Sequence, residues 1–471
     1  MLPRYGFRSV IARTEPVNRA RGLRHKLPWI FTTACLTITL LIMASVAIPW
    51  GRPAQGAETK PGTLPETPLT FEESVKIAIN QSPYLTKSSL EIDIRKMDEN
   101  DSRYGMVPPL TFRTIYYVNR PNDATLNSKP YSLNFSTDPY NPLGSYFTLQ
   151  AQKLATKGAI YKHLQTISAG LKRLGQIYLD LAALKKVAGY QKDLVKESQE
   201  KLTYMENRLS IGTATSLDVK VAQQELELAK GEVKTIDLAT QRNLNALRGF
   251  LGLPPSQQVN PDLRDADRQV LGSFTPNSAT LEQSKDRSYE IKIFELQKQL
   301  QKYNISLAIA KVFPSILFNT QTPDPLSSTT AGGIYVGVGL EIPVWDGFKR
   351  IRNVSRQKTT LRQLEAEKDQ KENALENKWY GAVGEIQEAE VALKFAKARE
   401  ELARLKANQN EVRYQSGEVQ LPVVLDGRKE VLASQKDTAR ESAKYDKAVL
   451  NLREASGDLG NTYVHASSFE E

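Results

Sequence analysis

Two short stretches of the chain decide its fold: "RLSIGTATSLDV" at residues 208–219 and "RYQSGEVQLPVV" at residues 413–424. We call them the first tip and the second tip. In each tip an arginine stands four residues before a glycine, and helical periodicity continues on both sides. Glycine adopts the positive φ that ends a helix with the least strain. Each tip therefore predicts a reversal between two long helices, so we expect two helical hairpins.

A constant offset of 205 residues relates the two tips and the segments around them. Arg208 matches Arg413 and Gly212 matches Gly417, and the register runs from residue 107 to residue 252 of the first half. One offset over this length indicates a duplicated unit with almost no net insertion. We expect the first repeat at residues 70–255, a linker at 256–275, the second repeat at 276–460 and a tail at 461–471.

Long helices are predicted on both sides of each tip. Between residues 156 and 207 there is no proline, and apolar residues recur at steps of three and four. This heptad-like spacing favours antiparallel coiled-coil packing. The expected helices lie at residues 156–207, 216–250, 350–413 and 422–457.

A pair of strands is predicted ahead of each hairpin, at residues 109–119 and 144–152 and at residues 312–321 and 333–345. In the last of these one face is wholly apolar and the other is polar or glycine. Such alternation fits either an ordinary sheet on a soluble core or part of a membrane barrel. Four strands cannot close a barrel that holds water, so the barrel interpretation requires an oligomer. The fold class is α+β and mostly α.

The first 57 residues have the pattern of an export signal. A basic stretch precedes an uncharged apolar run at residues 29–48, and an uncleaved membrane anchor is the alternative. The proline-rich residues 58–69 predict a linker. Thr70, with Glu73 three residues later, predicts the capped start of the first helix.

The net charge of +10 lies mostly in that N-terminal segment, which holds eight Lys or Arg and one acid. The remainder has 55 basic and 52 acidic residues. We expect no basic stripe interleaved with aromatic residues there, so nucleic acid is not an expected partner.

Residues that carry catalysis are scarce. The chain has three histidines, and its one cysteine, Cys35, lies in the predicted signal. The glycines of "GVGLEIPVWDG" alternate within a predicted strand and do not form a phosphate-binding loop. We expect no enzyme, no cofactor and no metal site.

The order of these features resembles the TolC-like outer-membrane efflux proteins. The resemblance rests on the two tips, "TFEESVKIAINQSPYL", "NALRGFLGLPP" and "LEIPVWDGFKR", and it covers residues 69–460. It implies a homotrimer in which four strands from each chain form one twelve-stranded β-barrel in the lipid of the outer membrane. The helices would continue as an α-helical barrel across the periplasm, where a periplasmic adaptor and an inner-membrane pump or ABC transporter dock.

The resemblance also assigns roles at the tips. In the family the helix-to-helix turns lie at the periplasmic end and contact the adaptor. The equivalent residues here are Arg208, Leu209, Gly212, Arg413 and Gly417.

A gate is implied next to these turns. The family ties its closed end with polar side chains, of which Asp218 and Tyr414 are retained and one arginine is replaced by Val419. Of two pore-facing acids, one is replaced by Val423 and the other is retained as Asp426. The resemblance thus implies a looser lock and less cation preference than two rings of acids confer, unless Asp426 faces the outer surface.

Two functions fit these expectations. The first is the outer-membrane channel of a tripartite efflux or type I secretion system, a passive export duct across the periplasm and outer membrane. The alternative is a non-conducting periplasmic coiled-coil adaptor or structural protein anchored by its N-terminal segment. Adaptors normally carry one helical hairpin and a lipoyl-like β-domain, whereas this sequence predicts two hairpins and no such domain, which favours the channel.

Overall fold

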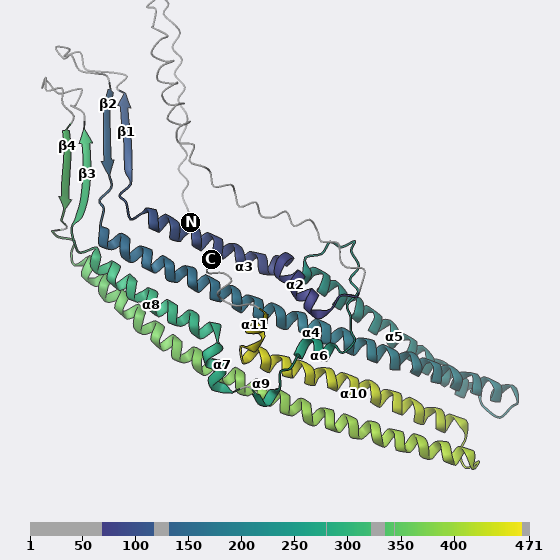
Figure 1. Cartoon of the computed structure of the whole chain (residues 1–471). Coiled ribbons are helices and arrows are strands. Elements are labelled where there is room, and N and C mark those ends of the chain that lie inside the picture. Colours follow the sequence, from purple (N-terminus) through teal and green to yellow (C-terminus); the bar gives the residue numbers. More distant parts are fainter. Residues whose placement is uncertain (1–67, 117–130, 279, 322–334, 343, 464–471) are drawn as a thin grey trace, which may run out of the picture. The chain divides into compact units, whose positions relative to one another are not determined.

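The computed structural model describes residues 68–116, 131–278, 280–321, 335–342 and 344–463, all within one compact unit that spans residues 63–471. The predicted signal at residues 1–57, nearly all of the predicted linker at 58–69 and most of the tail at 461–471 lie outside the described residues. Helices make up most of what is described (Figure 1). None of the described helices combines the length and the apolar character needed to cross a membrane.

Two long helical hairpins are present, as the tips predict. In the first, α4 (Pro142–Ser210) runs into the first tip and α5 (Ser216–Leu251) returns. In the second, α9 (Lys349–Gln415) runs into the second tip and α10 (Leu421–Ala455) returns. The 69 residues of α4 extend over about 100 Å. Because α10 packs against both α9 and α4, the hairpins lie side by side (Figure 1).

The predicted helix start at Thr70 is confirmed. The Thr70 hydroxyl accepts a hydrogen bond from the Glu73 N–H at 3.3 Å, and the Glu73 carboxylate accepts one from the Thr70 N–H at 2.9 Å. This capping box starts α2 (Phe71–Gln81). Pro83 then opens α3 (Pro83–Tyr104), because proline is tolerated in the first turn of a helix.

Further helices lie between the first hairpin and residue 310. The predicted linker at 256–275 contains α6 (Ala266–Leu271), which buries Ala266 and Val270. Three more helices follow α6, and one follows α10. They are η1 (Pro276–Ser278), α7 (Leu281–Arg287), α8 (Tyr289–Ala310) and α11 (Asp458–Tyr463).

Four strands form one antiparallel sheet in the order β1-β2-β3-β4. They are β1 (Leu110–Tyr116), β2 (Tyr131–Thr137), β3 (Ser315–Gln321) and β4 (Tyr335–Glu341). The two halves of the chain meet in this sheet, where Phe135 of β2 lies opposite Thr320 of β3. β1 and β4 are the edges, and neither has a second neighbour among the described residues.

The strand predicted at residues 144–152 is wrong. Those residues belong to the first turns of α4, and the partner of β1 is β2. The Asn141 side chain caps α4 by accepting a hydrogen bond from the Gly144 N–H at 3.0 Å, with Pro142 in the first turn. The weak alternation of "GSYFTLQAQ" suits a strand or a helix, and this cap selects the helix. β4 also ends at Glu341, short of the predicted residue 345.

The largest hydrophobic core lies where α2, α4, α5, α6 and α10 meet. Tyr178 of α4 is fully buried there, and its hydroxyl group bonds to the Ser74 hydroxyl at 2.5 Å. Gly175 lets α4 approach its neighbours closely, because a Cβ at this position would lie 2.8 Å from Val270 of α6 and 2.9 Å from Leu450 of α10. The core therefore holds both hairpins together through the middle of α4.

Candidate functional site

The first tip is a turn held by its own arginine. Gly212 has a φ of +74°, and the Thr213 N–H donates to the Arg208 carbonyl at 2.8 Å. The Arg208 guanidinium folds back and donates to the Thr213 carbonyl at 2.9 Å. Immediately after the turn, Thr215 and Asp218 form a capping box that starts α5. The arginine thus closes the turn with its backbone and its side chain together.

The second tip repeats this turn, but its arginine side chain has a different acceptor and no capping box follows. Gly417 has a φ of +80°, and the Glu418 N–H donates to the Arg413 carbonyl at 2.8 Å. Here the Arg413 guanidinium donates to the Glu418 carboxylate, at 3.0 Å, and not to a carbonyl. An arginine four residues before the glycine recurs because its carbonyl and its side chain both reach the turn from that position.

One hydrogen bond joins the two tips. Arg208 Nη1 donates to Gln420 Oε1 at 2.5 Å. Gln420 precedes α10 but does not cap it with its side chain, so its amide oxygen is available to the other hairpin. The two turns are therefore connected directly, at the end of each hairpin.

Four charged side chains cross-link the hairpins close to the tips. We call Lys201 (α4), Glu225 (α5), Asp426 (α10) and Lys429 (α10) the tip cluster. Lys201 Nζ lies 2.8 Å from the Asp426 carboxylate and 3.1 Å from that of Glu225. Lys429 Nζ lies 3.0 Å and 2.7 Å from the same two groups. Two cations and two anions alternate, so the cluster carries no net charge.

Pairing outweighs burial in the tip cluster. Burial alone would lower the pKa of Lys201, but its hydrogen bonds to Asp426 and Glu225 raise it. For Asp426 burial acts toward a higher pKa, and the hydrogen bonds from Lys201 and Lys429 bring it below its usual value. Lys201 and Asp426 are therefore both charged at neutral pH, and Asp426 is not an isolated acid.

A second ion pair lies seven residues further along both helices. Lys436 of α10 contacts Glu232 of α5 at 2.7 Å and the Gln191 side chain of α4 at 3.0 Å. Lys429–Glu225 and Lys436–Glu232 are each 204 residues apart, so one heptad register holds α10 against the first hairpin. Polar groups at inward heptad positions specify register, and this pair does so here.

The model of the outer membrane efflux protein family matches residues 76–253 and 280–458, which is more than half of the chain. The chain belongs to this family. Membership places it among the efflux channels of the outer membrane and not among enzymes. No curated protein matches the chain.

Solved structures of outer-membrane channels share the fold of this efflux protein. VceC from Vibrio cholerae matches with a TM-score of 0.66 at 14% identity, over 82% of this chain and 96% of VceC. CmeC from Campylobacter jejuni matches with a TM-score of 0.68 at 14% identity, over 84% of this chain and 88% of CmeC. The open state of MtrE from Neisseria gonorrhoeae matches with a TM-score of 0.64 at 14% identity, over 83% of this chain and 89% of MtrE.

The predicted gate residues of this efflux protein are only partly brought together. The Asp218 carboxylate accepts bonds from the Thr215 N–H and hydroxyl, both at 2.8 Å, and these lower its pKa. Tyr414 is 41% exposed and makes no hydrogen bond to Asp218 within the described part of the chain. Val423 is 42% exposed. Of the predicted gate side chains, only Asp426 is joined to the other hairpin by an ion pair in the described structure.

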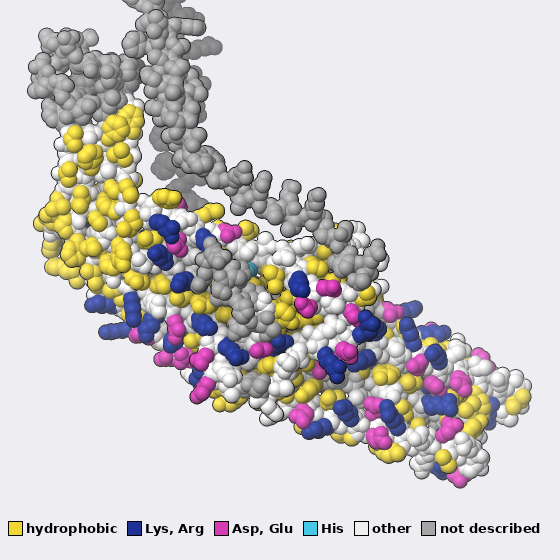
Figure 2. Space-filling model, in the orientation of Figure 1, with side chains coloured by type: hydrophobic (Ala, Val, Ile, Leu, Met, Phe, Trp, Pro, Cys, Tyr) yellow, Lys and Arg dark blue, Asp and Glu magenta, His cyan; other side chains and the backbone are white. Residues whose placement is uncertain are grey.

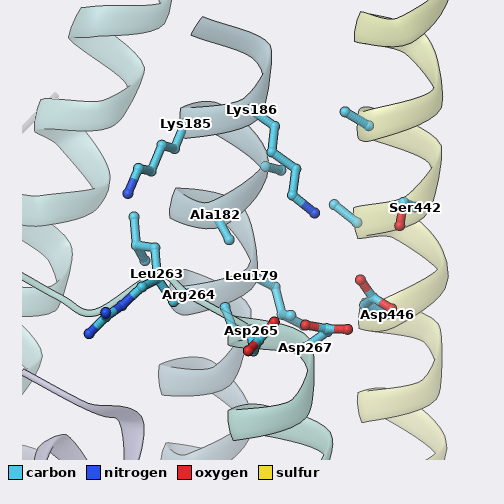
Figure 3. Close-up of a pocket in the computed structure, with 14 residues that line it drawn as sticks. Leu179, Ala182, Lys185, Lys186, Leu263, Arg264, Asp265, Asp267, Ser442 and Asp446 are labelled. Carbon is cyan, nitrogen blue, oxygen red and sulfur yellow. The ribbon is translucent and has the colours of Figure 1, made fainter. Parts of the chain in front are cut away.

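A hollow of about 510 Å³ lies between α4, α6 and α10 of the efflux protein (Figure 3). The side chains of Asp267 and Asp446 face each other at one end, and Lys185 and Lys186 lie toward the other (Figure 3). Burial, and then the neighbouring Asp267, raise the pKa of Asp446 to about 6, against the opposing effect of Lys186. Among the described residues, no three His, Cys, Asp or Glu side chains are grouped to hold a metal ion.

Reasoning from the sequence missed the partners of Asp426. Lys201, Glu225 and Lys429 are ordinary charged residues of long helices, where such groups are usually solvated. One signal was present: Glu225 and Glu232, like Lys429 and Lys436, are seven residues apart and therefore repeat on one helix face.

Proposed function

We propose that three copies of this efflux protein form a passive export duct, the outer-membrane channel of a tripartite efflux or type I secretion system. The strands of the trimer form one twelve-stranded barrel in the outer membrane, and the hairpins form an α-helical barrel in the periplasm. A periplasmic adaptor and an inner-membrane pump or ABC transporter complete the system. The chain is a duplicated unit, which the recurring order of strand pair and hairpin and the two matched ranges support.

The sheet carries this proposal. Val336, Val338 and Leu340 lie on one face of β4 and are 65%, 77% and 60% exposed. A contiguous apolar face turned to solvent marks a surface that lipid or protein covers. The edges β1 and β4 lack partners among the described residues, and exposed edges of this kind are closed in membrane barrels. Strands from further copies supply the closure, and lipid covers the apolar face.

The outer faces of two helices support the trimer. Both carry exposed apolar side chains, all of which are more than half exposed in the single chain. They are Leu217, Val221, Leu228 and Leu238 on α5, and Val391, Phe395, Leu402, Leu405 and Val412 on α9. The α9 residues follow one another at steps of 4, 7, 3 and 7, which is coiled-coil spacing. Helices of a second copy fit such a stripe.

The two tips are the proposed contact with the adaptor. The first tip exposes Leu209 to 40% and Ile211 to 72%, so it offers apolar surface beside the Arg208 guanidinium. Gly212 and Gly417 shape the turns, and Arg208 and Arg413 hold them closed. An adaptor helix that packs on these turns would bury the exposed leucine and isoleucine.

The proposed gate lies next to the tips, and the tip cluster determines its charge. Asp426 is the retained acid of the pore, and Lys201 and Lys429 neutralise it. Val419 and Val423 leave the second tip with fewer polar ties than the family norm. We therefore propose a constriction with weak cation preference and a loosely tied closed state, in which Tyr414 and Asp218 meet only between copies.

Mass measurement in detergent and conductance in planar bilayers test the proposal together. We expect a mass of three chains and discrete, voltage-tolerant conductance steps. A monomer that carbonate washes from membranes and that never conducts would instead favour the periplasmic adaptor or structural protein.

A further inference from the structure

The start of α9 is a strongly basic segment. Residues 349–362, which we call the basic segment, hold six cations and no acid. They are Lys349, Arg350, Arg352, Arg356, Lys358 and Arg362. The nearly neutral balance of the chain after residue 57, with 55 basic and 52 acidic residues, conceals this local concentration of cations. The cations are concentrated where β4 leads into the second hairpin.

Few cations of the basic segment are ion-paired in the described structure. Arg350 lies 3.5 Å from Asp346, and the other five cations have no carboxylate within ion-pair distance among the described residues. Lys349, Arg350 and Arg352 lie in the first turn of α9, where they also oppose the helix dipole, because cations at a helix N-terminus are disfavoured and anions are favoured. Both facts favour an anion from outside the chain.

A hollow of about 780 Å³ opens beside the basic segment. Its lining includes three cations, Lys311, Lys349 and Arg350, and one acid, Asp346. Arg350 Nη1 is buried and has no hydrogen-bond acceptor. A buried guanidinium N–H without an acceptor is costly, and an oxyanion in the hollow would satisfy it.

Large apolar side chains lie next to these cations. Val344, Trp345 and Phe348 are 91%, 75% and 56% exposed, and the Trp345 and Phe348 rings meet edge to face at 5.1 Å. Figure 2 shows Lys and Arg side chains gathered over the start of α9, directly beside the hydrophobic band at the foot of the strands. Aromatic rings beside cations are typical of the interface between a bilayer and water.

We propose that the basic segment and the adjoining hollow bind the phosphate groups of anionic phospholipids, while Trp345 and Phe348 lie among the upper acyl chains. This rests on the proposed function, in which the strands occupy the outer membrane and α9 begins at its periplasmic leaflet. The lipid supplies an anion that the helix dipole and the unpaired cations favour and that Arg350 Nη1 can bind. It also covers the exposed aromatic rings, which a free anion would leave in water.

Lipid titration of two matched triple variants of the detergent-purified full-length protein tests the proposal. The first variant carries Arg352→Gln, Arg356→Gln and Lys358→Gln. The control carries Lys394→Gln, Lys397→Gln and Lys406→Gln, which removes the same charge from exposed positions further along α9. Phosphatidylglycerol is the probe, phosphatidylcholine is the uncharged comparison, and inorganic phosphate is the free-anion competitor.

We expect the native protein and the control to prefer phosphatidylglycerol, and the basic-segment variant to bind it at least about tenfold more weakly. Equal binding by both variants, no preference over phosphatidylcholine, or equally tight binding of inorganic phosphate overturns the proposal. Dissociation of the trimer in the basic-segment variant alone would also overturn it, because the cations would then face a neighbouring copy. Conductance in neutral bilayers keeps the two proposals separate, since it tests the channel whether or not the lipid site exists.

Discussion

Lys201 Nζ lies 2.8 Å from the Asp426 carboxylate, and this contact joins two hairpins across 225 residues of sequence. In the proposed channel this contact would change what Asp426 contributes. An isolated ring of three such carboxylates would attract cations, whereas a ring in which each carboxylate has two lysine partners would be electrically balanced. The charge of the proposed constriction would therefore depend on the lysines as much as on the acid.

Lys201→Met should make the channel more selective for cations. The substitution leaves Glu225 and Asp426 sharing Lys429 alone, so each copy gains one uncompensated negative charge. The reversal potential in a salt gradient measures the change. Lys196→Met is the control, because the Lys196 side chain is 77% exposed and, among the described residues, its only ion pair is with Asp193 three residues earlier on α4. Unchanged selectivity in Lys201→Met, or equal shifts in both variants, would show that the cluster does not face the conduction path.

Asp426→Ala tests the same proposed ring by removing its acid instead of a lysine. Its removal leaves Lys201 and Lys429 with only Glu225, so we expect cation preference to fall and anion permeation to rise. Planar-bilayer selectivity again provides the measurement. If selectivity stays the same, Asp426 lies outside the pore.

Gly417→Ala should destabilise the second tip by about 1 kcal/mol, because a Cβ is strained at a φ of +80°. Gly381→Ala is the control: Gly381 lies within α9, where a Cβ has open space, so alanine should stabilise the helix by roughly 0.5–1 kcal/mol. Urea unfolding and the rate of proteolysis at the tip report on both. We expect the two substitutions to change the free energy of unfolding in opposite directions. Equal changes would contradict a turn that depends on positive φ.

Gly175→Ala should destabilise the protein by about 1–3 kcal/mol, because its Cβ would meet Val270 at 2.8 Å and Leu450 at 2.9 Å. Gly189→Ala lies on the same helix with open space around the new methyl group and should be neutral or stabilising. Thermal unfolding distinguishes them. A harmless Gly175→Ala would mean that α4 does not pack tightly on α6 and α10.

Asp446→Asn should stabilise the protein at pH 7.5 and leave it nearly unchanged at pH 4. The pKa of the Asp446 carboxyl is about 6 in the folded state and about 3.9 in the unfolded state. The stability that the protonated carboxyl confers is therefore fully present below about pH 3.9 and is lost as the pH rises through about 6. The expected gain is up to about 2 kcal/mol at neutral pH. Asp437→Asn, at a 61% exposed site on the same helix, is the control. A pH profile of thermal stability that Asp446→Asn fails to flatten would contradict the assignment.

Local patterns were sufficient for the hairpins. Heptad spacing over dozens of residues, the Thr70–Glu73 capping box and the two glycines at the tips all act within a few residues, so they can be read without knowing the fold. The predicted bounds of α5 and α10 differ from those observed by at most two residues at each end. The predicted strand at residues 144–152 is wrong because a short, weakly alternating stretch suits either structure, and the side chain that selects the helix, Asn141, lies outside that stretch.

The sequence by itself determined the two hairpins, the turn within each hairpin, the family and the residues of each tip. Tertiary structure alone decided which charges meet, because Lys201 and Asp426 lie on different hairpins and no local pattern couples positions so far apart. It also decided the meaning of the basic segment. Six cations are visible in the sequence, but only the fold shows that the neighbouring aromatic rings are exposed and that five of the cations have no carboxylate within ion-pair distance among the described residues.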